Sequence, residues 1–493
     1  MTKQDKNFRK GFKKGRYQPI SKRKRAKQTN QYKKSINIFE NNQLIKPRNF
    51  QKMICLKRNV NNDFFVNNIK AYKNHGRSQH FRGIDDILKL KDVDGLISCW
   101  KAGLVFSFIT SEDFITKIEE ACDKVVVVTD GFKDSKYIKK KKAYKKTILY
   151  YAQREFGANI PSSFHPKLLI IVNDKIMRLV IGSGNFFNED WNMYSNVFWT
   201  IDLKRSASES TTKTDFSDSL ENFCFGCLGD HWKDIKKYLN FCFESFDFRD
   251  DYYRLIYSLP TSFHTNKNEL SNLPRIRQIL TQTPPTIPYS LNKTTIIYYT
   301  SSIVTINLGF LYDFCSAVFG NSMPNWESVV SDKFQILNCF QVVYPTQDFV
   351  AGCFFGEASA KCLFLRQNEY ERCNFEKSVL RKFEGNQRFL GSDQILPHVK
   401  AFVIMNNKVI DDDSTIYMGS HNFTKAAWGF NDYKTSKTKG FNYELGLIIF
   451  PQKGSKMAKC SLIDRIGINL NPKGYGKNDK PFFSDGEFGN GKE

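Results

Sequence analysis

The chain has 493 residues, of which 41% are hydrophobic and 25% are charged, and its formal net charge is +24. This length exceeds one ordinary domain, so we expect two globular domains plus tails. The hydrophobic content is high enough for buried cores and excludes a chain that is disordered throughout.

Residues 1–80 are predicted to be a basic, largely disordered tail, because they lack helical or strand periodicity and are rich in Lys, Asn and Gln. The first fifty residues hold sixteen Lys and Arg against only Asp5 and Glu40. Such charge favours a phosphate-rich partner, because Lys and Arg release the counterions of phosphates. A solvated tail that only keeps the protein in solution is the alternative. Within the tail, Lys22–Lys27 (KRKRAK) indicates a nuclear-localisation signal or a nucleic-acid patch.

The globular part begins near residue 83, where apolar residues start to recur. Residues 124–132 (KVVVVTDGF) are typical of a strand buried on both faces. The basic stretch 136–153 that follows is predicted to be a helix. A Pro-containing segment at 259–289 interrupts the periodicity, and we place the domain boundary there. The predicted domains are 81–262 and 263–475, followed by a flexible tail at 476–493.

The cysteines and the apolar stretches indicate in which kind of cellular compartment the protein is expected. Twelve cysteines form no regular framework and no apolar secretory segment precedes them, so we expect a reducing, intracellular setting. The pair Cys224 and Cys227 lacks a second pair at zinc-site spacing, which favours buried thiols. Residues 301–320 are the most apolar long stretch, but Asn307 and Asp313 interrupt it, so we expect no membrane partner.

Two segments of the chain repeat one another. The first, HPKLLIIVNDKIMRLVIGSGNFF, begins at residue 165, and the second, HVKAFVIMNNKVIDDDSTIYMGSHNFT, begins at residue 398. Each contains His-x-Lys, an apolar strand, a turn, a second strand and Gly-Ser-x-Asn-Phe, so each is predicted to be a β-hairpin whose Asn returns close to its His. The equivalent residues are His165, Lys167 and Asn185 in the first copy and His398, Lys400 and Asn422 in the second.

These residue types suit the cleavage of a phosphodiester. The reaction needs a nucleophile, a proton for the leaving oxygen, and positive charge on the non-bridging oxygens. Near neutral pH a histidine can serve as nucleophile or as proton donor. Two lysines and two asparagines can hold the phosphoryl oxygens, so we predict one metal-independent phosphodiesterase site without a cofactor. Asp411, Asp412 and Asp413 lie in a predicted turn, where acidic residues are normal, and are not assigned to a metal.

The repeat resembles the phospholipase D superfamily, in which two half-sites meet at a domain interface. More narrowly it resembles the tyrosyl-DNA phosphodiesterase family, which lacks the Asp that usually follows His-x-Lys in the superfamily. Here too no Asp takes that place, and GSHNFTKAAWG (419–429) is followed by Glu444. The resemblance covers roughly residues 80–475. It implies an α/β fold of two phospholipase D-like domains with pseudo-twofold symmetry, each a mixed β-sheet flanked by helices.

The resemblance also implies roles. The activity would be DNA repair, in which 3′-phosphotyrosyl adducts of the topoisomerase I type are hydrolysed through a covalent phosphohistidine. His165 would be the nucleophile and His398 the general acid and then the base, while the lysines and asparagines bind the phosphoryl oxygens. Glu444 would orient the base histidine. Asn196 stands where the family has a Gln that supports the other histidine, and its side chain is shorter.

The expected partners are 3′ ends of single-stranded or duplex DNA that carry tyrosyl-peptide adducts, and the expected location is the nucleus, with the chain as a monomer. His421 has a Gly as its counterpart in the first copy, so a local or substrate-edge role is expected for it. Two alternatives stay open: a phospholipase D-like nuclease or phospholipase with another leaving group, or a catalytically silent nucleic-acid-binding scaffold. The residues expected to touch the substrate besides the two motifs are Ser301, Ser302, Ser420, Phe164 and Asn196.

Overall fold

The computed structural model describes residues 62–67, 81–89, 100–130, 144–151, 162–206, 213–248, 253–260, 271–385, 395–432, 437–449, 463 and 467–485. The predicted disorder of the basic tail concerns residues that, apart from 62–67, lie outside these ranges. Within the described part, no helix has the length and apolar character needed to cross a membrane.

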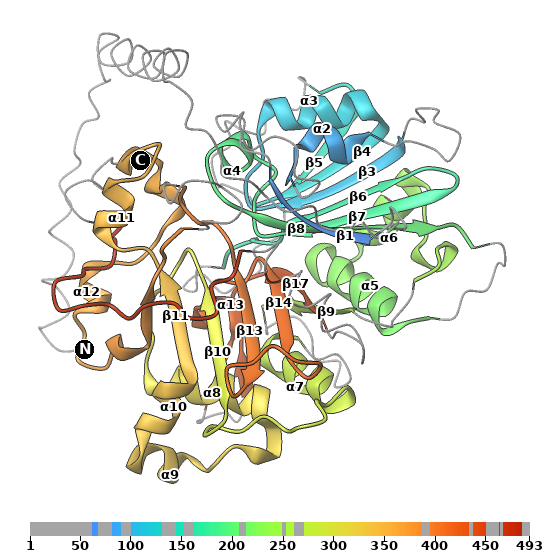
Figure 1. The fold of residues 1–493 in the computed structure, drawn as a ribbon. Helices are drawn as coiled ribbons and strands as arrows, with labels where there is room; N and C mark the ends of the chain where they lie inside the picture. The colour runs from blue at the N-terminus through green and yellow to red at the C-terminus, as the bar shows by residue number, and fades with distance from the viewer. Residues whose placement is uncertain are drawn as a thin grey trace, which may run out of the picture. The chain divides into compact units, whose positions relative to one another are not determined.

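The first domain is built on a mixed sheet of eight strands (Figure 1). Their order is β2-β1-β8-β7-β6-β3-β4-β5. The strands are β1 (Asn62–Asn67), β2 (Phe81–Arg82), β3 (Trp100–Ser107), β4 (Cys122–Thr129), β5 (Thr147–Tyr151), β6 (Leu168–Val172), β7 (Ile176–Gly182) and β8 (Val197–Lys204).

The second domain is built on a mixed sheet of seven strands in the order β12-β11-β10-β13-β14-β17-β9. These strands are β9 (Tyr253–Ser258), β10 (Thr294–Tyr299), β11 (Phe340–Tyr344), β12 (Leu380–Lys382), β13 (Ala401–Asn406), β14 (Thr415–Gly419) and β17 (Glu444–Ile449). A separate antiparallel pair is formed by β15 (Phe430–Asp432) and β16 (Lys437–Lys439).

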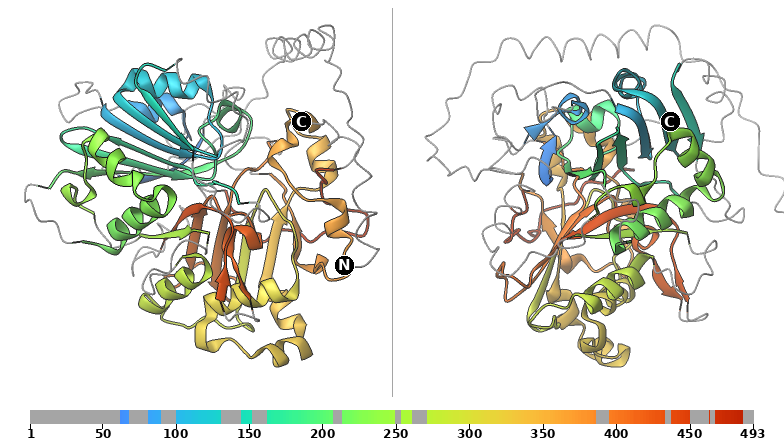
Figure 2. Two further views of the ribbon diagram at one scale, coloured as in Figure 1. Left: turned by 180° about the vertical axis from the view of Figure 1, so that it is seen from behind. Right: turned by 90° about the vertical axis from the view of Figure 1, so that its right-hand side faces the viewer.

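The two sheets have the same strand topology over their central strands. In both, a central strand pairs in parallel with the next strand of the chain on one side and antiparallel with the first strand of the repeated hairpin on the other. Thus β3, β4, β6, β7 and β8 correspond to β10, β11, β13, β14 and β17. The hairpins β6–β7 and β13–β14 are those predicted from the repeat. Figure 2 shows the two sheets from two further directions.

Three apolar cores explain why the strand sequences are apolar almost throughout. Alternate residues of one strand belong to different cores: Val403 lies in the core between the two sheets, and Ile404 lies in the core on the outer face of the second sheet. The first sheet behaves likewise, with Ile170 in the shared core and Ile171 outside it. Because both faces are buried, alternation of apolar and polar residues is lost.

Helices cover the remaining surfaces of the sheets. Helices α2 and α3 pack on the outer face of the first sheet, α5 and α6 on its other face beside the shared core, and α7, α8 and α10 on the outer face of the second sheet (Figures 1 and 2). The α-helices are α2 (Ile84–Leu88), α3 (Glu112–Ala121), α4 (Asn188–Asn192), α5 (Asp215–Leu228), α6 (His231–Leu239), α7 (Asn272–Gln282), α8 (Leu308–Phe319), α9 (Trp326–Ser331), α10 (Lys333–Cys339), α11 (Gln347–Ala351), α12 (Gln367–Tyr370) and α13 (Lys425–Trp428). Short 3-10 helices are η3 (Phe243–Ser245), η4 (Gly320–Ser322), η5 (Glu357–Cys362) and η6 (Lys377–Val379).

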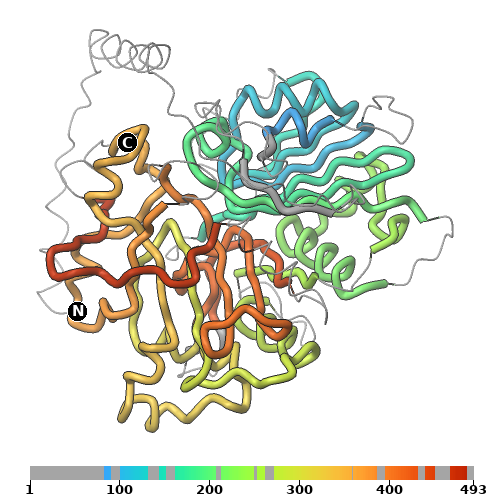
Figure 3. Tube along the Cα trace, viewed as in Figure 1, coloured from blue at the N-terminus to red at the C-terminus, as the bar shows by residue number. Residues whose placement is uncertain are grey.

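The structure differs from the predicted domain bounds in three places. Strand β9 lies inside 81–262 but pairs with β17 of the second sheet, so the chain enters the second sheet before the predicted boundary (Figure 3). Strand β1 lies inside the predicted tail but pairs with β8. Residues 476–485 were predicted to be a loose tail, yet Phe482 is buried and the Gln347 backbone N–H donates to the carbonyl of Lys480.

Two local predictions had different outcomes. The residues KVVVVT form β4, as predicted, and all four valines are buried. The helix predicted for 136–153 is wrong over Thr147–Tyr151, which form strand β5 and pair in parallel with β4. The β-branched and aromatic residues of β5 suit an edge strand, and pairing with β4 overrides the charge pattern that favoured a helix.

Asn307, which interrupts the apolar stretch, is the N-cap of α8 and accepts the backbone N–H of Phe310.

Candidate active site

The two histidine segments are each held by a strand end of the other domain. The His165 backbone N–H donates to the carbonyl of Tyr443 at 2.9 Å, just before β17. In the same way, the His398 backbone N–H donates to the carbonyl of Ser195 at 2.9 Å, just before β8. This reciprocal pairing is what pseudo-twofold symmetry produces, and it brings both repeats to one junction between the sheets.

The imidazole of His165 is held by a buried carboxylate. Its Nδ1 lies 2.8 Å from Oε2 of Glu444, a residue with no exposed surface. The hydroxyl of Ser420 donates to the same oxygen at 2.5 Å, and the side-chain amide of Asn442 donates to Oε1 at 3.0 Å. A carboxylate with this many donors stays ionised, so Nδ1 of His165 carries the proton and Nε2 is left free.

The imidazole of His398 has two acceptors. Its Nδ1 lies 3.1 Å from Oδ1 of Asn196 and 3.1 Å from Oδ2 of Asp190. The Asn196 side chain is oriented by Ser183, whose hydroxyl donates to Oδ1 at 3.0 Å. Asn196 therefore reaches His398 directly, although it is shorter than a Gln.

These contacts correct the prediction of which side chain orients which histidine. Glu444 was expected to orient His398 and Asn196 to support His165, but the structure has the reverse pairing. The physical reason is the pseudo-twofold relation: the residue that begins β17 lies beside the His165 segment, and the residue before β8 lies beside the His398 segment. Each orienting side chain thus acts on the histidine of the other domain.

The two lysines are completely buried at the junction. The ammonium of Lys167 donates to the carbonyl of His165 at 2.6 Å, and that of Lys400 donates to the carbonyl of His398 at 2.8 Å. Lys400 also donates to the carbonyl of Ser183 in the first domain at 3.2 Å. Backbone oxygens of both half-sites therefore hold the two lysine side chains at the junction.

The two motif asparagines have different surroundings. Oδ1 of Asn422 accepts from the hydroxyls of Thr300 and Ser301 at 3.2 and 3.1 Å and from the backbone N–H of Ser302 at 3.1 Å. Its amide group is thereby aimed by the Ser-Ser segment that was predicted to touch the substrate. Oδ1 of Asn185 is buried, and within the described part of the chain it has no hydrogen-bond partner.

Burial dominates the protonation of both histidines. Burial and the nearby lysines lower the pKa of His165 to about 4, although Glu444 acts in the opposite direction. Burial and Lys400 likewise lower the pKa of His398 to about 4, although Asp190 opposes them. Both imidazoles are therefore neutral near pH 7 in the empty site.

The charged groups of the site shift as well. Burial lowers the pKa of Lys400 to about 7, against the attraction of Asp190. Burial acts to raise the pKa of the Glu444 and Asp190 carboxyls, but the contacting histidine and the other neighbouring donors and charges together outweigh it, and both pKa values lie below the ordinary range. Asp190 was not among the predicted residues. Its signal in the sequence is weak, because it follows Asn185 by five residues whereas Ala427 holds that place in the second copy.

Residues 63–482 match the sequence model of the tyrosyl-DNA phosphodiesterase family. The chain belongs to this family.

Relatives with this name support the assignment. Tyrosyl-DNA phosphodiesterase 1 of Arabidopsis thaliana is 26% identical over 331 residues, which is 61% of this chain and 50% of the relative. Tyrosyl-DNA phosphodiesterase 1 of Drosophila melanogaster is 23% identical over 347 residues, 65% of this chain and 57% of the relative. The matches thus span about half the length of these relatives. A crystal structure of a yeast tyrosyl-DNA phosphodiesterase 1 mutant superposes with a TM-score of 0.64 at 16% identity, covering 86% of this chain and 99% of that one, and confirms the predicted fold.

Other predicted site residues of this tyrosyl-DNA phosphodiesterase family member are placed differently. Phe164 was expected to touch the substrate, but it is 1% exposed and packs against Phe106 and Tyr443 in the shared core. It cannot meet a base without unpacking that core. The ring of Phe108, which is only partly buried, lies beside His165, with centroids 5.8 Å apart.

His421 is enclosed by hydrogen-bonding groups. Its Nδ1 lies 2.6 Å from the hydroxyl of Tyr417, its Nε2 lies 2.9 Å from that of Ser258, and its ring stacks on Trp428. It has no exposed surface, so of the two expected roles the local one agrees with the structure. In the described part of the chain, no group of three or more His, Cys, Asp or Glu is arranged to hold a metal ion.

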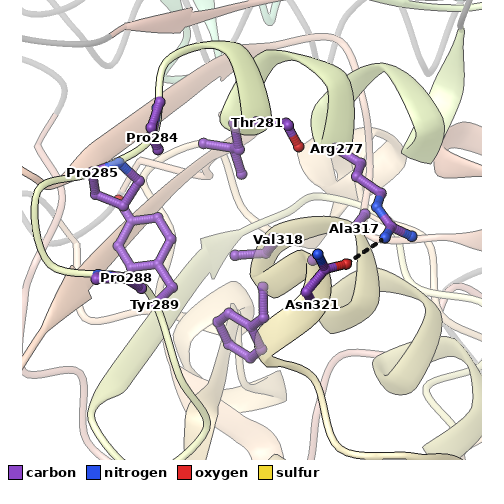
Figure 4. Close-up of a pocket in the computed structure, with 12 residues that line it drawn as sticks. Arg277, Thr281, Pro284, Pro285, Pro288, Tyr289, Ala317, Val318 and Asn321 are labelled. Carbon is purple, nitrogen blue, oxygen red and sulfur yellow. Dashed lines mark hydrogen bonds between the residues drawn. The ribbon is translucent and has the colours of Figure 1, made fainter.

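A separate pocket of about 350 Å³ lies between α7, the loop that follows it and the end of α8 (Figure 4). It is lined mainly by prolines of the 284–288 loop, Tyr289 and the end of α8, with Arg277 bonded to Asn321 at its rim. The loop is tied to the β13–β14 turn through Asp413, which accepts the backbone N–H of Thr286 at 2.7 Å. None of the motif residues lines this pocket.

Proposed function

We propose that the chain hydrolyses 3′-phosphotyrosyl bonds on DNA through a covalent phosphohistidine, in a reaction of DNA repair that requires no metal. The observation that carries the proposal is the reciprocal arrangement of two complete half-sites, in which each histidine is oriented from the other domain and two buried lysines lie between them. Membership of the tyrosyl-DNA phosphodiesterase family supports the choice of leaving group.

In the first step, Nε2 of His165 attacks the phosphorus atom. His165 suits this role because it is neutral and because Glu444 holds its proton on Nδ1. A bound phosphodiester anion favours the charged form of the two buried lysines. The ammonium groups of Lys167 and Lys400 and the amides of Asn185 and Asn422 then stabilise the charge that develops on the phosphoryl oxygens. The tyrosine oxygen leaves from phosphorus and takes a proton.

His398 supplies that proton and later removes one from water. In the empty site its pKa is about 4, because of burial and Lys400. A phosphodiester anion bound beside the ring favours the charged form, so substrate binding raises the pKa of His398 and allows it to act as the acid. After the tyrosine has left, neutral His398 takes a proton from a water molecule. That water attacks phosphorus, the bond to His165 breaks, and DNA with a 3′ phosphate is released.

The proposed partner is the 3′ end of DNA, and the proposed location is the nucleus. The charge of the first fifty residues and the run KRKRAK support both, since basic segments bind phosphates and serve as import signals. Imaging of a fluorescent fusion, with and without replacement of the basic residues in Lys22–Lys27, tests the location: equal distribution of both forms would contradict the role of this run.

The activity is tested by incubating the purified chain with a 3′-phosphotyrosyl oligonucleotide in EDTA. We expect a 3′-phosphate product, because the lysines provide the charge that a metal would otherwise supply. Parallel reactions with an unmodified oligonucleotide and with phosphatidylcholine vesicles represent the alternative nuclease and phospholipase activities. Cleavage of either one in preference to the phosphotyrosyl substrate, or no cleavage at all, would contradict the proposed function.

A further inference from the structure

The two catalytic histidines have unequal supports. His165 is backed by a carboxylate, whereas Asn196, which occupies the corresponding place for His398, offers only an amide oxygen. The carboxylate of Asp190 lies at the same distance from Nδ1 of His398, 3.1 Å. We propose that Asp190 is a positioning residue for His398, so that each catalytic histidine carries its own carboxylate. This inference rests on the proposed function.

Asp190 is fixed in place by groups on both sides of it. Its Oδ2 accepts the backbone N–H of Asn185 at 2.6 Å, and its main-chain carbonyl accepts the side-chain amide of Asn196 at 2.8 Å. The Asp190 residue is 5% exposed and His398 is 6% exposed, so water does not compete for the contact. The same oxygen that holds the asparagine of the first motif therefore also holds the histidine of the second.

The chemistry of the contact favours one tautomer. A carboxylate can only accept, so Nδ1 of His398 must donate and Nε2 faces the reacting atoms. Asn196 alone would hold the same tautomer, but an amide oxygen carries no net charge to stabilise the imidazolium.

The balance of charge around His398 makes this stabilisation necessary. The charged groups that act on its ring are Lys400, Lys167 and Asp190, and the ring of Tyr194 lies 5.9 Å away. Burial and both lysines oppose protonation of His398, and Asp190 is the neighbouring charge that favours it. Asp190 thereby makes His398 a better acceptor of the proton from water in the second step.

The test compares Asp190→Asn with the native chain in single-turnover reactions on a 3′-phosphotyrosyl oligonucleotide. In the Ser-His-Asp triad of serine proteases, replacing the Asp by Asn typically costs about 10⁴-fold in kcat. Because Asn196 still holds the ring of His398, we expect a smaller loss of about ten- to a thousandfold. KM is expected to change little, and hydrolysis of the phosphohistidine to slow more than its formation. Because the variant lowers the pKa of His398, the alkaline limb of the formation rate moves to lower pH.

A matched control is Asp202→Asn. Asp202 is a carboxylate of the same domain that pairs with Arg178 at 2.6 Å outside the site, so its loss is expected to affect stability without moving the pH profile. Asp190→Glu keeps the charge and is expected to lower kcat while leaving the pH limbs near their native positions. A folded Asp190→Asn variant with native rates and a native pH profile would overturn the inference.

Two further outcomes keep the inference and the proposed function separate. If the native chain itself does not turn over, the proposed function fails first. If Asp190→Asn does not fold, nitrogen NMR of labelled histidines in the native chain still tests the contact, with the His398 signals assigned by their loss in a His398 variant. We expect the Nδ1–H tautomer for His398, and an Nε2–H tautomer would overturn the role of Asp190.

Discussion

At the residue scale, each of the two motif histidines meets a carboxylate, although different tasks are proposed for them. Both are neutral and both meet a carboxylate at Nδ1. In the proposed reaction they differ in that the phosphorus becomes attached to only one of the two histidines. We propose His165 as the nucleophile, so the phosphorus becomes attached to the first half-site.

Substitution of each histidine by Ala distinguishes the roles. The first step expels a phenolate whose conjugate acid has a pKa of about 10, so loss of His398 is expected to slow this step only partly. Hydrolysis of the phosphohistidine needs a base, whose loss typically costs about 10²- to 10⁴-fold. We therefore expect His398→Ala to accumulate protein joined to DNA on a denaturing gel, and His165→Ala to form no adduct. Adduct in the His165 variant alone would mean that the roles are reversed.

At the element scale, the pairing of β14 with β17 sets the positions of three site residues. Asn422 and Ser420 follow the end of β14, and Glu444 begins β17. Gly419 and Gly446 face each other across this pair. A Cβ added to Gly419 would lie 2.4 Å from Cα of Gly446 and 2.6 Å from the carbonyl oxygen of Leu445, which are backbone atoms that cannot rotate away.

Gly419→Ala is accordingly expected to destabilise the protein by about 1–3 kcal/mol or more, as overpacking does, and to reduce activity because the strands are forced apart. The control is Gly309→Ala in the first turn of α8, where the nearest atom to an added Cβ is 3.6 Å away and where Ala is a better helix former than Gly. Urea unfolding of both variants measures the difference. Equal stability of the two would contradict the close approach of β14 and β17.

At the scale of the whole molecule, the buried histidines connect stability to pH. The pKa of His165 and that of His398 are lowered to about 4 by burial, and burial lowers the pKa of His421 to about 3. In the unfolded chain these residues bind protons at an ordinary pKa of about 6.5. Between pH 6.5 and 4 the unfolded state therefore binds more protons than the folded state, and the stability present above pH 6.5 is lost as the pH falls.

Each buried histidine contributes a slope of about 1.4 kcal/mol per pH unit within this window. The lowered pKa values of Glu444 and Asp190 extend the loss below pH 4. Guanidinium unfolding measured from pH 7 to pH 4 checks the prediction, in a buffer without phosphate because an anion would bind the lysines. A free energy of unfolding that stays constant across this range would contradict the burial of the neutral histidines.

The basic tail is the other feature of the whole molecule that can be tested. Deletion of residues 1–50 removes sixteen Lys and Arg and is expected to weaken DNA binding and to flatten its dependence on salt, because fewer counterions are released. Sequence preference is expected to stay the same, since phosphate contacts position a protein without reading bases. Binding measured at several salt concentrations for both chains provides the slopes, and identical slopes would assign the tail another purpose, such as import.

Much of the fold and of the site could be predicted because it is local. Each hairpin contains its own strands and turn within fewer than thirty residues, and the His-x-Lys and Gly-Ser-x-Asn groups are placed by the hairpin ends. Repetition of this unit was enough to predict two half-sites and two similar domains. The buried valines of β4 were likewise evident from their own apolar character.

Only the tertiary structure decided which groups meet across the domain junction. Glu444 and His165 are 279 residues apart, and their contact depends on the pseudo-twofold relation between the sheets, which no local pattern encodes. For the same reason Asp190 went unrecognised and Phe164 was misjudged: the burial that couples Asp190 to His398 and encloses Phe164 comes from packing one sheet against the other. The sequence by itself determined the chemical groups of the site and their local spacing, whereas packing decided their partners and protonation, because both depend on burial and on charges brought in from the opposite domain.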